Sequence, residues 1–251
     1  MSDADQLSLR LDSDVLPALP ELRPMLPRPL PEPFDSPDHL FEPWWGGVRA
    51  LASIGPADLP GTGEVRIVDE TGLDRSSVLP ELAGMAVRVV ARSAILDGEL
   101  VVVDGAGRAD ATELARRLDG EAGRPAAFLA FDLLHLDGRS LLSWPLARRR
   151  EALRRVLRPG DEVVAVPAIS TEGRALFEAV VAQGVGGVLA RQRSSPYLPG
   201  VRSRLWRSIG VPGGPVAAAA LDDEDGALDP PPTAAAPVLA LISRLPLDDE
   251  T

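Results

Sequence analysis

Residues 126–136 constrain the fold of this chain more than any other stretch. They form a largely apolar run of strand length that ends at the turn sequence Asp137-Gly138. A strand buried on both faces is the simplest account of such a run. We therefore expect this segment to lie inside a sheet that is covered on both sides.

Shorter segments with strand or helix signals surround this run. Apolar and β-branched residues predict strands over 47–54, 64–69, 86–90, 94–103, 163–167, 188–192 and 205–209. Helical spacing predicts a short element that begins at 79–82 and helices over 111–118, 146–157 and 173–183, the last stopped by a glycine C-cap at Gly184. The helix over 146–157 carries arginines that predict a solvated face, with a patch for nucleic-acid phosphates as the alternative. These are Arg148, Arg149, Arg150, Arg154 and Arg155.

Composition limits the classes of protein to which this chain can belong. With 251 residues and 45% hydrophobic content, it suits one large domain or a domain with a small appendage. Its 26 basic residues are all arginines and its net charge is -11, which argues against a free-standing DNA binder, because such a protein needs a basic surface. The absence of cysteine excludes disulfides and thiolate metal sites, and 2 histidines are too few for a histidine-rich metal centre.

The ends of the chain differ in composition from its middle. Residues 1–33 are rich in proline, which blocks helices and removes sheet donors, so we expect an extended arm on the domain surface, anchored by its leucines and Met25. Residues 211–251 are linker-like, acidic and proline-rich, with apolar islands at 216–221 and 238–245 that fit two strands of a vestigial second domain. The chain has no apolar run near the roughly 20 residues of a membrane helix and no basic signal-peptide start, so the expected location is the cytoplasm.

Four segments stand out, in order along the chain: FEPWWGGVR at 41–49 after a lead-in from residue 34, LDGEL at 96–100, FDLLHLDGR at 131–139, and GVLAR through YLPGVRSRLW at 187–206. Together they resemble the adenylation domain of ATP-dependent DNA ligases. The resemblance implies an α+β fold for residues 34–210: a nucleotidyltransferase (ATP-grasp-like) domain of two antiparallel sheets with flanking helices that clasp a nucleotide. Family ligases also carry an oligonucleotide-binding-fold domain, and residues 211–251 are too short for a complete one.

The first of these segments departs from the family pattern at the position of the nucleophile. The family motif reads K-x-D-G-x-R, and its lysine amine attacks the α-phosphate of ATP. Here Trp44 stands in place of the lysine and Gly46 in place of the aspartate, while Gly47 and Arg49 keep the glycine and the arginine. The chain contains no lysine anywhere, so no other lysine can take over. We therefore expect no catalytic residue and no self-adenylation.

The later segments have lost groups that handle triphosphate and metal in the family. By resemblance, Glu99 lies near the ribose or metal, with a hairpin-turn carboxylate as the alternative, and Phe131 stacks on adenine, with a plain core phenylalanine as the alternative. In the segment that corresponds to the family motif E-G-x-x-A-K, Gly186 replaces the glutamate and Arg191 replaces the lysine. A guanidinium stays protonated at neutral pH and is no nucleophile. The W-x-K-x-K motif keeps Trp206 and loses both lysines.

These losses predict a catalytically inactive DNA-ligase-like protein, a pseudoenzyme that acts as a scaffold or regulatory partner in DNA repair or recombination. It would have no metal ligands and only weakened binding of ATP or AMP with Mg. One alternative is a non-catalytic nucleotide-binding sensor, and another is a ligase active only with a nucleophile that a partner supplies. The expected partner is a protein of DNA end repair, and neither DNA nor a membrane is expected. The predicted degenerate pocket consists of Glu42, Trp44, Arg49, Glu99, Phe131 and Arg191.

Overall fold

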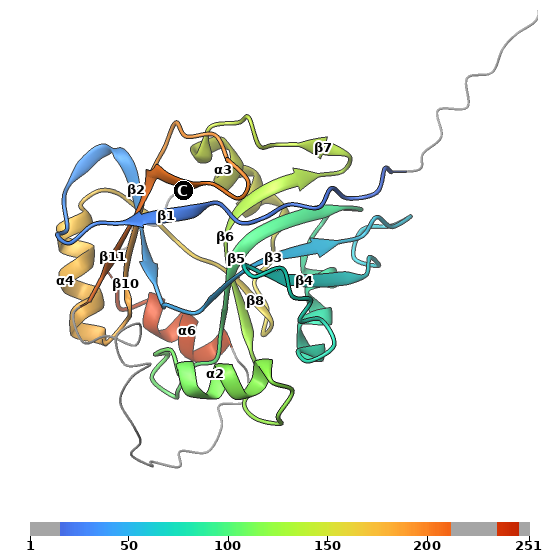
Figure 1. Ribbon diagram of the computed structural model, residues 1–251, viewed down its shortest axis with the longest axis horizontal. Helices are drawn as coiled ribbons and strands as arrows, with labels where there is room; N and C mark the ends of the chain where they lie inside the picture. Colours follow the sequence, from blue (N-terminus) through green and yellow to red (C-terminus); the bar gives the residue numbers. More distant parts are fainter. Residues whose placement is uncertain (1–15, 212–234, 246–251) are drawn as a thin grey trace, which may run out of the picture.

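Two β-sheets form most of this computed structural model, which describes residues 16–211 and 235–245. The smaller sheet has the strand order β1-β11-β10-β2-β9, and the larger has the order β4-β3-β5-β6-β7 with β8 paired to β6 (Figure 1). The strands are β1 (Leu26–Pro29), β2 (Ser36–Trp44), β3 (Val48–Ile54), β4 (Val65–Asp69), β5 (Ala94–Val101), β6 (Ala127–Leu136), β7 (Arg139–Ser140), β8 (Val163–Ala165), β9 (Ile169–Thr171), β10 (Gly187–Gln192) and β11 (Arg202–Gly210).

Helices flank the two sheets, as the resemblance predicted. The α+β prediction is therefore confirmed; most strand pairs are antiparallel, and β1 with β11 and β8 with β6 run parallel. The predicted helices over 111–118, 146–157 and 173–183 all form, and Gly184 ends the last of them with φ 70°. The helices are a 3-10 helix (Pro80–Gly84), α1 (Met85–Arg88), α2 (Ala111–Leu118), α3 (Leu146–Val156), α4 (Gly173–Gln183) and α6 (Ala235–Ile242).

Strand β6 carries the apolar run that was predicted to be buried on both faces. All of its residues except Leu136 are buried. Side chains alternate across a strand, so Phe128 and Ala130 enter the core beneath α2 and α3, whereas Leu129 and Phe131 enter the core shared with the smaller sheet and α4. This second core joins the two sheets.

Residues 86–90 are helical in part and do not form the predicted strand. The 3-10 helix leads directly into α1, and Met85, Ala86 and Val89 are buried against the core beneath α2 and α3. Their spacing of three and four residues places them on one helical face. Within the described residues, the sheet pairing of this stretch is limited to an isolated bridge between Val89 and Leu157. An apolar run this short does not distinguish strand from helix by its period.

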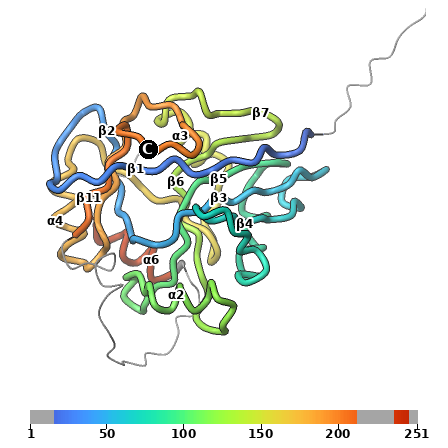
Figure 2. Tube along the Cα trace, viewed as in Figure 1, coloured from blue at the N-terminus to red at the C-terminus, as the bar shows by residue number. Residues whose placement is uncertain are grey.

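The N-terminal arm ends in strand β1, which the sequence did not predict. An edge position tolerates Pro27 and Pro29, because one side of an edge strand needs no donors. Met25 is the anchor that was predicted, and it is fully buried between strands β3, β5 and β6 of the larger sheet and Trp206 of the smaller one. The described part of the arm, residues 16–33, thus runs across both sheets (Figure 2).

Helix α6 lies in the C-terminal segment for which strands were expected. Val238, Leu241 and Leu245 are buried against the core that joins the sheets, at the spacing of a helical face. The expected strand over 238–245 is therefore wrong, and the apolar island at 216–221 lies outside the described residues.

Among the helices of the described residues, none has the length and apolar character needed to cross a membrane.

Candidate nucleotide site

A cavity of about 260 Å³ lies where the N-terminal arm meets both sheets. Its lining includes prolines of β1, Ser208 of β11, and four of the six residues predicted for the nucleotide pocket. These four are Trp44, Arg49, Glu99 and Phe131. The other two, Glu42 and Arg191, are fully buried and do not line the cavity.

Trp44 lies at the end of β2 and forms part of the cavity wall. Its backbone is paired with Gly187 of β10, and its ring extends toward the end of β11, where a Cβ added to Gly210 would lie 3.9 Å from Cζ3 of Trp44. The side chain is only partly buried. An indole therefore stands where the family places an amine.

Glu99 holds the turn that follows Trp44. Its two carboxylate oxygens accept hydrogen bonds from the backbone N–H groups of Trp45 and Gly47, each at 3.0 Å. Burial raises the pKa of Glu99 to about 7, although these donors act in the opposite direction. Gly47 is required in this turn because an added Cβ would lie 2.1 Å from the carbonyl oxygen of Leu100. The Glu99 side chain thus links β5 to the turn between β2 and β3, and it also lines the cavity.

Arg49 is neutralised by a carboxylate that the sequence analysis did not single out. Its Nε and Nη2 atoms donate to Oδ1 and Oδ2 of Asp97 at 2.7 and 2.6 Å. Burial alone would lower the pKa of Arg49, but the Asp97 charge raises it above its usual range. The guanidinium also lies 4.6 Å from the Phe131 ring centroid. Asp97 belongs to the LDGEL segment, two residues before Glu99 on the same face of β5, and this spacing is the signal that could have identified it.

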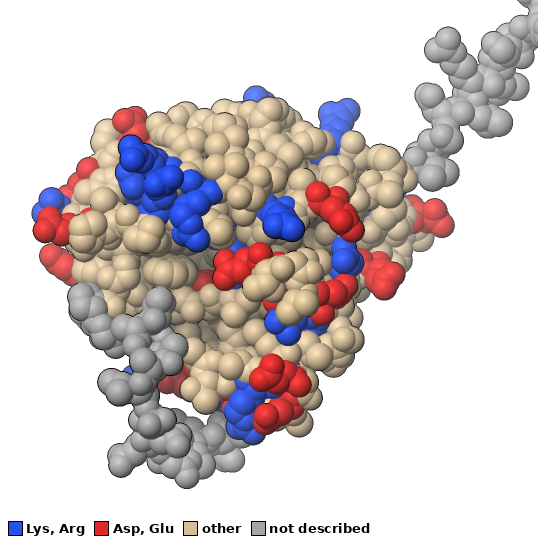
Figure 3. All heavy atoms as spheres, in the orientation of Figure 1, with Lys and Arg blue, Asp and Glu red and all other residues tan. Residues whose placement is uncertain are grey.

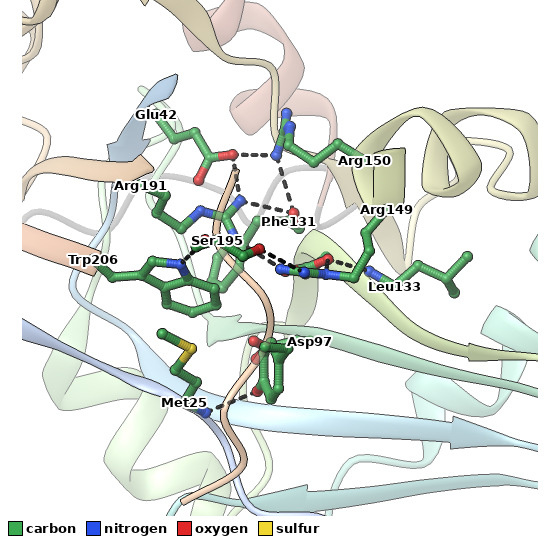
Figure 4. A network of polar contacts seen from close by, with 12 residues as sticks. Met25, Glu42, Asp97, Phe131, Leu133, Arg149, Arg150, Arg191, Ser195 and Trp206 are labelled. Atoms are coloured by element: carbon green, nitrogen blue, oxygen red, sulfur yellow. Dashed lines mark hydrogen bonds and ion pairs between the residues drawn. The ribbon is translucent and has the colours of Figure 1, made fainter. Parts of the chain in front are cut away.

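Glu42 and Arg191 meet in a buried network behind Phe131 (Figure 4). One oxygen of Glu42 accepts hydrogen bonds from both Arg150 and Arg191. The Phe131 carbonyl accepts from the same two guanidinium groups, at 3.1 Å from Arg150 and 2.8 Å from Arg191. Arg191 also contacts Trp206, whose ring centroid is 4.9 Å from its Cζ. The arginine that replaces the family lysine therefore serves the packing between the sheets.

Helix α3 supplies two of the buried guanidinium groups, which corrects the prediction of a solvated arginine face. Arg149 is bound to Asp132 at 2.9 and 2.8 Å, with both side chains 0% exposed. Arg150 is buried against Glu42, whereas Arg148, Arg154 and Arg155 are exposed. The signal was available in the spacing, because residues 149, 150 and 153 follow Leu146 by three, four and seven positions and so share its buried face.

The cavity is small, and two of the charged groups predicted to handle phosphate or metal are engaged by other side chains of the protein. The volume of about 260 Å³ falls below the roughly 300–1,000 Å³ of typical small-ligand sites. Glu42 is turned onto two arginines and Arg49 onto Asp97, so neither group is free to meet phosphate or metal. Within the described residues, there is also no group of three or more histidine or acidic side chains that could hold a metal ion.

Residues 32–209 match the model of the family described as the ATP dependent DNA ligase domain. The chain belongs to this ligase family. DNA ligase C1 of Mycolicibacterium smegmatis is 33% identical to it over 211 residues, which cover 76% of this chain and 57% of that protein. The multifunctional non-homologous end joining DNA repair protein LigD of Mycobacterium tuberculosis is 34% identical over 166 residues, which cover 66% of this chain and 21% of that protein.

A solved ligase structure shares the fold of this ligase-family chain. Mycobacterial DNA ligase D, in a complex with ATP and MES, superposes with a TM-score of 0.62 at 28% identity, covering 75% of this chain and 60% of that one. The nucleotidyltransferase fold inferred from the motifs is therefore confirmed. The chain spans little more than half of DNA ligase C1 and about a fifth of LigD, so the match concerns the ligase domain and not those whole proteins.

Proposed function

We propose that this DNA-ligase-family chain does not adenylate itself and acts as a scaffold or regulatory partner in DNA end repair. The observation that carries the proposal is Trp44 at the nucleophile position of a chain that contains no lysine. Transfer of AMP to the enzyme needs a nucleophilic amine, and a guanidinium stays protonated at neutral pH. Arg191 is also fully buried and bound to Glu42 and to the Phe131 carbonyl, so it is not available to act as the nucleophile.

The repair context of the proposal rests on the relatives. One of them is named as a multifunctional non-homologous end joining DNA repair protein, and this chain matches it over 66% of the present sequence. We extend that context to the present chain together with a protein partner. A cytoplasmic place of action belongs to the same proposal.

Incubation of the full chain with labelled ATP and a divalent metal, followed by intact mass measurement, tests the missing self-adenylation. We expect no added AMP, while a DNA ligase treated in parallel gains one. An AMP adduct that is stable to alkali and labile to acid would overturn the proposal. Nick sealing by the purified chain would do the same, and sealing that requires a partner protein would support a partner-supplied nucleophile instead.

A nucleotide sensor without chemistry is the second candidate. The cavity favours it, because Trp44, Arg49, Glu99 and Phe131 still converge there. Calorimetric titration with ATP, ADP and AMP decides between the two candidates. Saturable binding of a mononucleotide supports the sensor, and no heat of binding at high ligand concentration eliminates it.

A further inference from the structure

Trp44 offers the cavity a ring that is not yet engaged. The other aromatic ring in the lining belongs to Phe131, which is 1% exposed and already contacts two guanidinium groups, with centroid distances of 4.6 Å to Arg49 and 5.3 Å to Arg191. Trp44 is only partly buried, and none of the aromatic or cation–π contacts among the described residues involves its ring. A flat, polarizable surface is thus free to stack on a ligand that enters the cavity.

An exposed arginine of β11 lies at the rim of the same cavity, and an exposed arginine of β1 lies next to it. Arg202 is part of the lining and donates to the Pro27 carbonyl at 2.8 Å, while Arg28 donates to the Arg202 carbonyl at 3.4 Å. Neither guanidinium has a carboxylate partner within the described ranges, and Figure 3 shows basic side chains gathered over this edge. The net charge of the chain is negative, but phosphate binding depends on the local field.

The size and charge of the cavity determine which part of a nucleotide can enter it. At about 260 Å³ it is smaller than typical small-ligand sites, which start at roughly 300 Å³, so a base fits better than a whole triphosphate. The carboxylates of Glu70 and Glu99 also line it and would repel a phosphate. A carboxylate accepts hydrogen bonds from the exocyclic amine of a base. The base would therefore lie inside and the phosphates at the arginine rim.

We propose that the cavity binds one unpaired base of a single-stranded nucleic acid, stacked on Trp44, with the flanking phosphates on Arg28 and Arg202. An aromatic platform beside a cationic groove is the general arrangement for sequence-tolerant single-strand binding. A duplex cannot supply the base, because its bases are paired and stacked. The inference rests on the proposed function and deepens it, since Trp44 becomes a recognition group where the family has a nucleophile.

Fluorescence anisotropy of an end-labelled single-stranded oligonucleotide, titrated with the full chain, tests the proposal. The blunt duplex of the same sequence serves as competitor, and we expect it to compete poorly. Trp44→Leu keeps an apolar side chain without the stack and is expected to weaken binding about tenfold or more, whereas Trp44→Phe retains most of the affinity. Unfolding curves of both variants show that the fold is intact.

The rim is tested by the salt dependence of the same titration. Arg28→Ala with Arg202→Ala is expected to lower the slope of log affinity against log salt by about 1.4, at roughly 0.7 per phosphate contact of a single strand. Arg139→Ala is the matched control, because Arg139 is exposed on β7 of the other sheet. Its slope should equal that of the unmodified chain.

Four results would overturn the inference: no single-strand binding, equal binding of the duplex, equal affinity of Trp44→Leu, or binding of an acidic peptide alone. None of these results bears on the predicted absence of self-adenylation, because the mass of the chain after incubation with ATP tests that prediction separately. Conversely, an AMP adduct removes the proposed function whether or not an oligonucleotide binds.

Discussion

The ion pair between Arg149 and Asp132 is the strongest single test of the buried network. It consists of two parallel hydrogen bonds of 2.9 and 2.8 Å, and both side chains are 0% exposed. Arg149 donates in addition to the carbonyls of Trp144 and Ser195. Asp132→Ala would leave the guanidinium in the core with neutral acceptors only.

Removal of one partner from a buried pair costs about 3–5 kcal/mol, because the remaining charge has no counterion and no water. In a domain of this size, 1 kcal/mol shifts Tm by roughly 2–4 °C, so Asp132→Ala is expected to lower Tm by roughly 6–20 °C. Replacing both partners with apolar residues, as in Asp132→Leu with Arg149→Met, should cost less, since the unpaired guanidinium of Arg149 is then removed, while Arg191, which lies 3.5 Å from Asp132, keeps Glu42 as its carboxylate partner.

Urea unfolding, followed by circular dichroism, measures these differences. Glu151→Ala is the matched control, because Glu151 pairs with Arg155 on the same helix α3 while their side chains are 53% and 69% exposed. Such a surface pair contributes about 0.3–0.5 kcal/mol. If Asp132→Ala costs no more than Glu151→Ala, or if the double replacement is as damaging as the single one, the reasoning on the buried pair is refuted.

Three further outcomes follow from the cavity and its supports. Burial raises the pKa of Glu99 from 4.5 to about 7. Between these pH values the folded state binds a proton that the unfolded state does not, so the free energy of unfolding falls as the pH rises through this window. Urea titrations at several pH values should show a weaker pH dependence of this free energy for Glu99→Gln. Gly47→Ala would place a Cβ 2.1 Å from a backbone oxygen and should lower Tm clearly, while Gly105→Ala, with nothing within 4 Å, should leave Tm almost unchanged. Met25→Ala removes a fully buried anchor and should cost about 2–5 kcal/mol and speed proteolysis of the arm; an unchanged cleavage rate would count against that anchoring.

Local patterns predicted most elements because their signals lie within a few residues. The run at 126–136 became β6, and the helix over 173–183 ended at Gly184 with the positive φ that a glycine C-cap needs. The errors fell on short apolar runs, at 86–90 and 238–245, where period alone does not separate strand from helix. Strand β1 was not predicted, because a strand tolerates two prolines only at the edge of a sheet, and which strand lies at the edge depends on how the whole sheet assembles.

The sequence by itself determined the family and the missing lysine, since both depend only on which residues stand at fixed positions in the motifs. The tertiary structure decided where the charges lie. Arg149 meets Asp132 across 17 residues, and Arg150 and Arg191 meet Glu42 across 108 and 149 residues. A buried guanidinium is stable only beside such a carboxylate, and chain folding alone brings the two together. For that reason, a helix face that looked solvated became part of the core beside the cavity at Trp44.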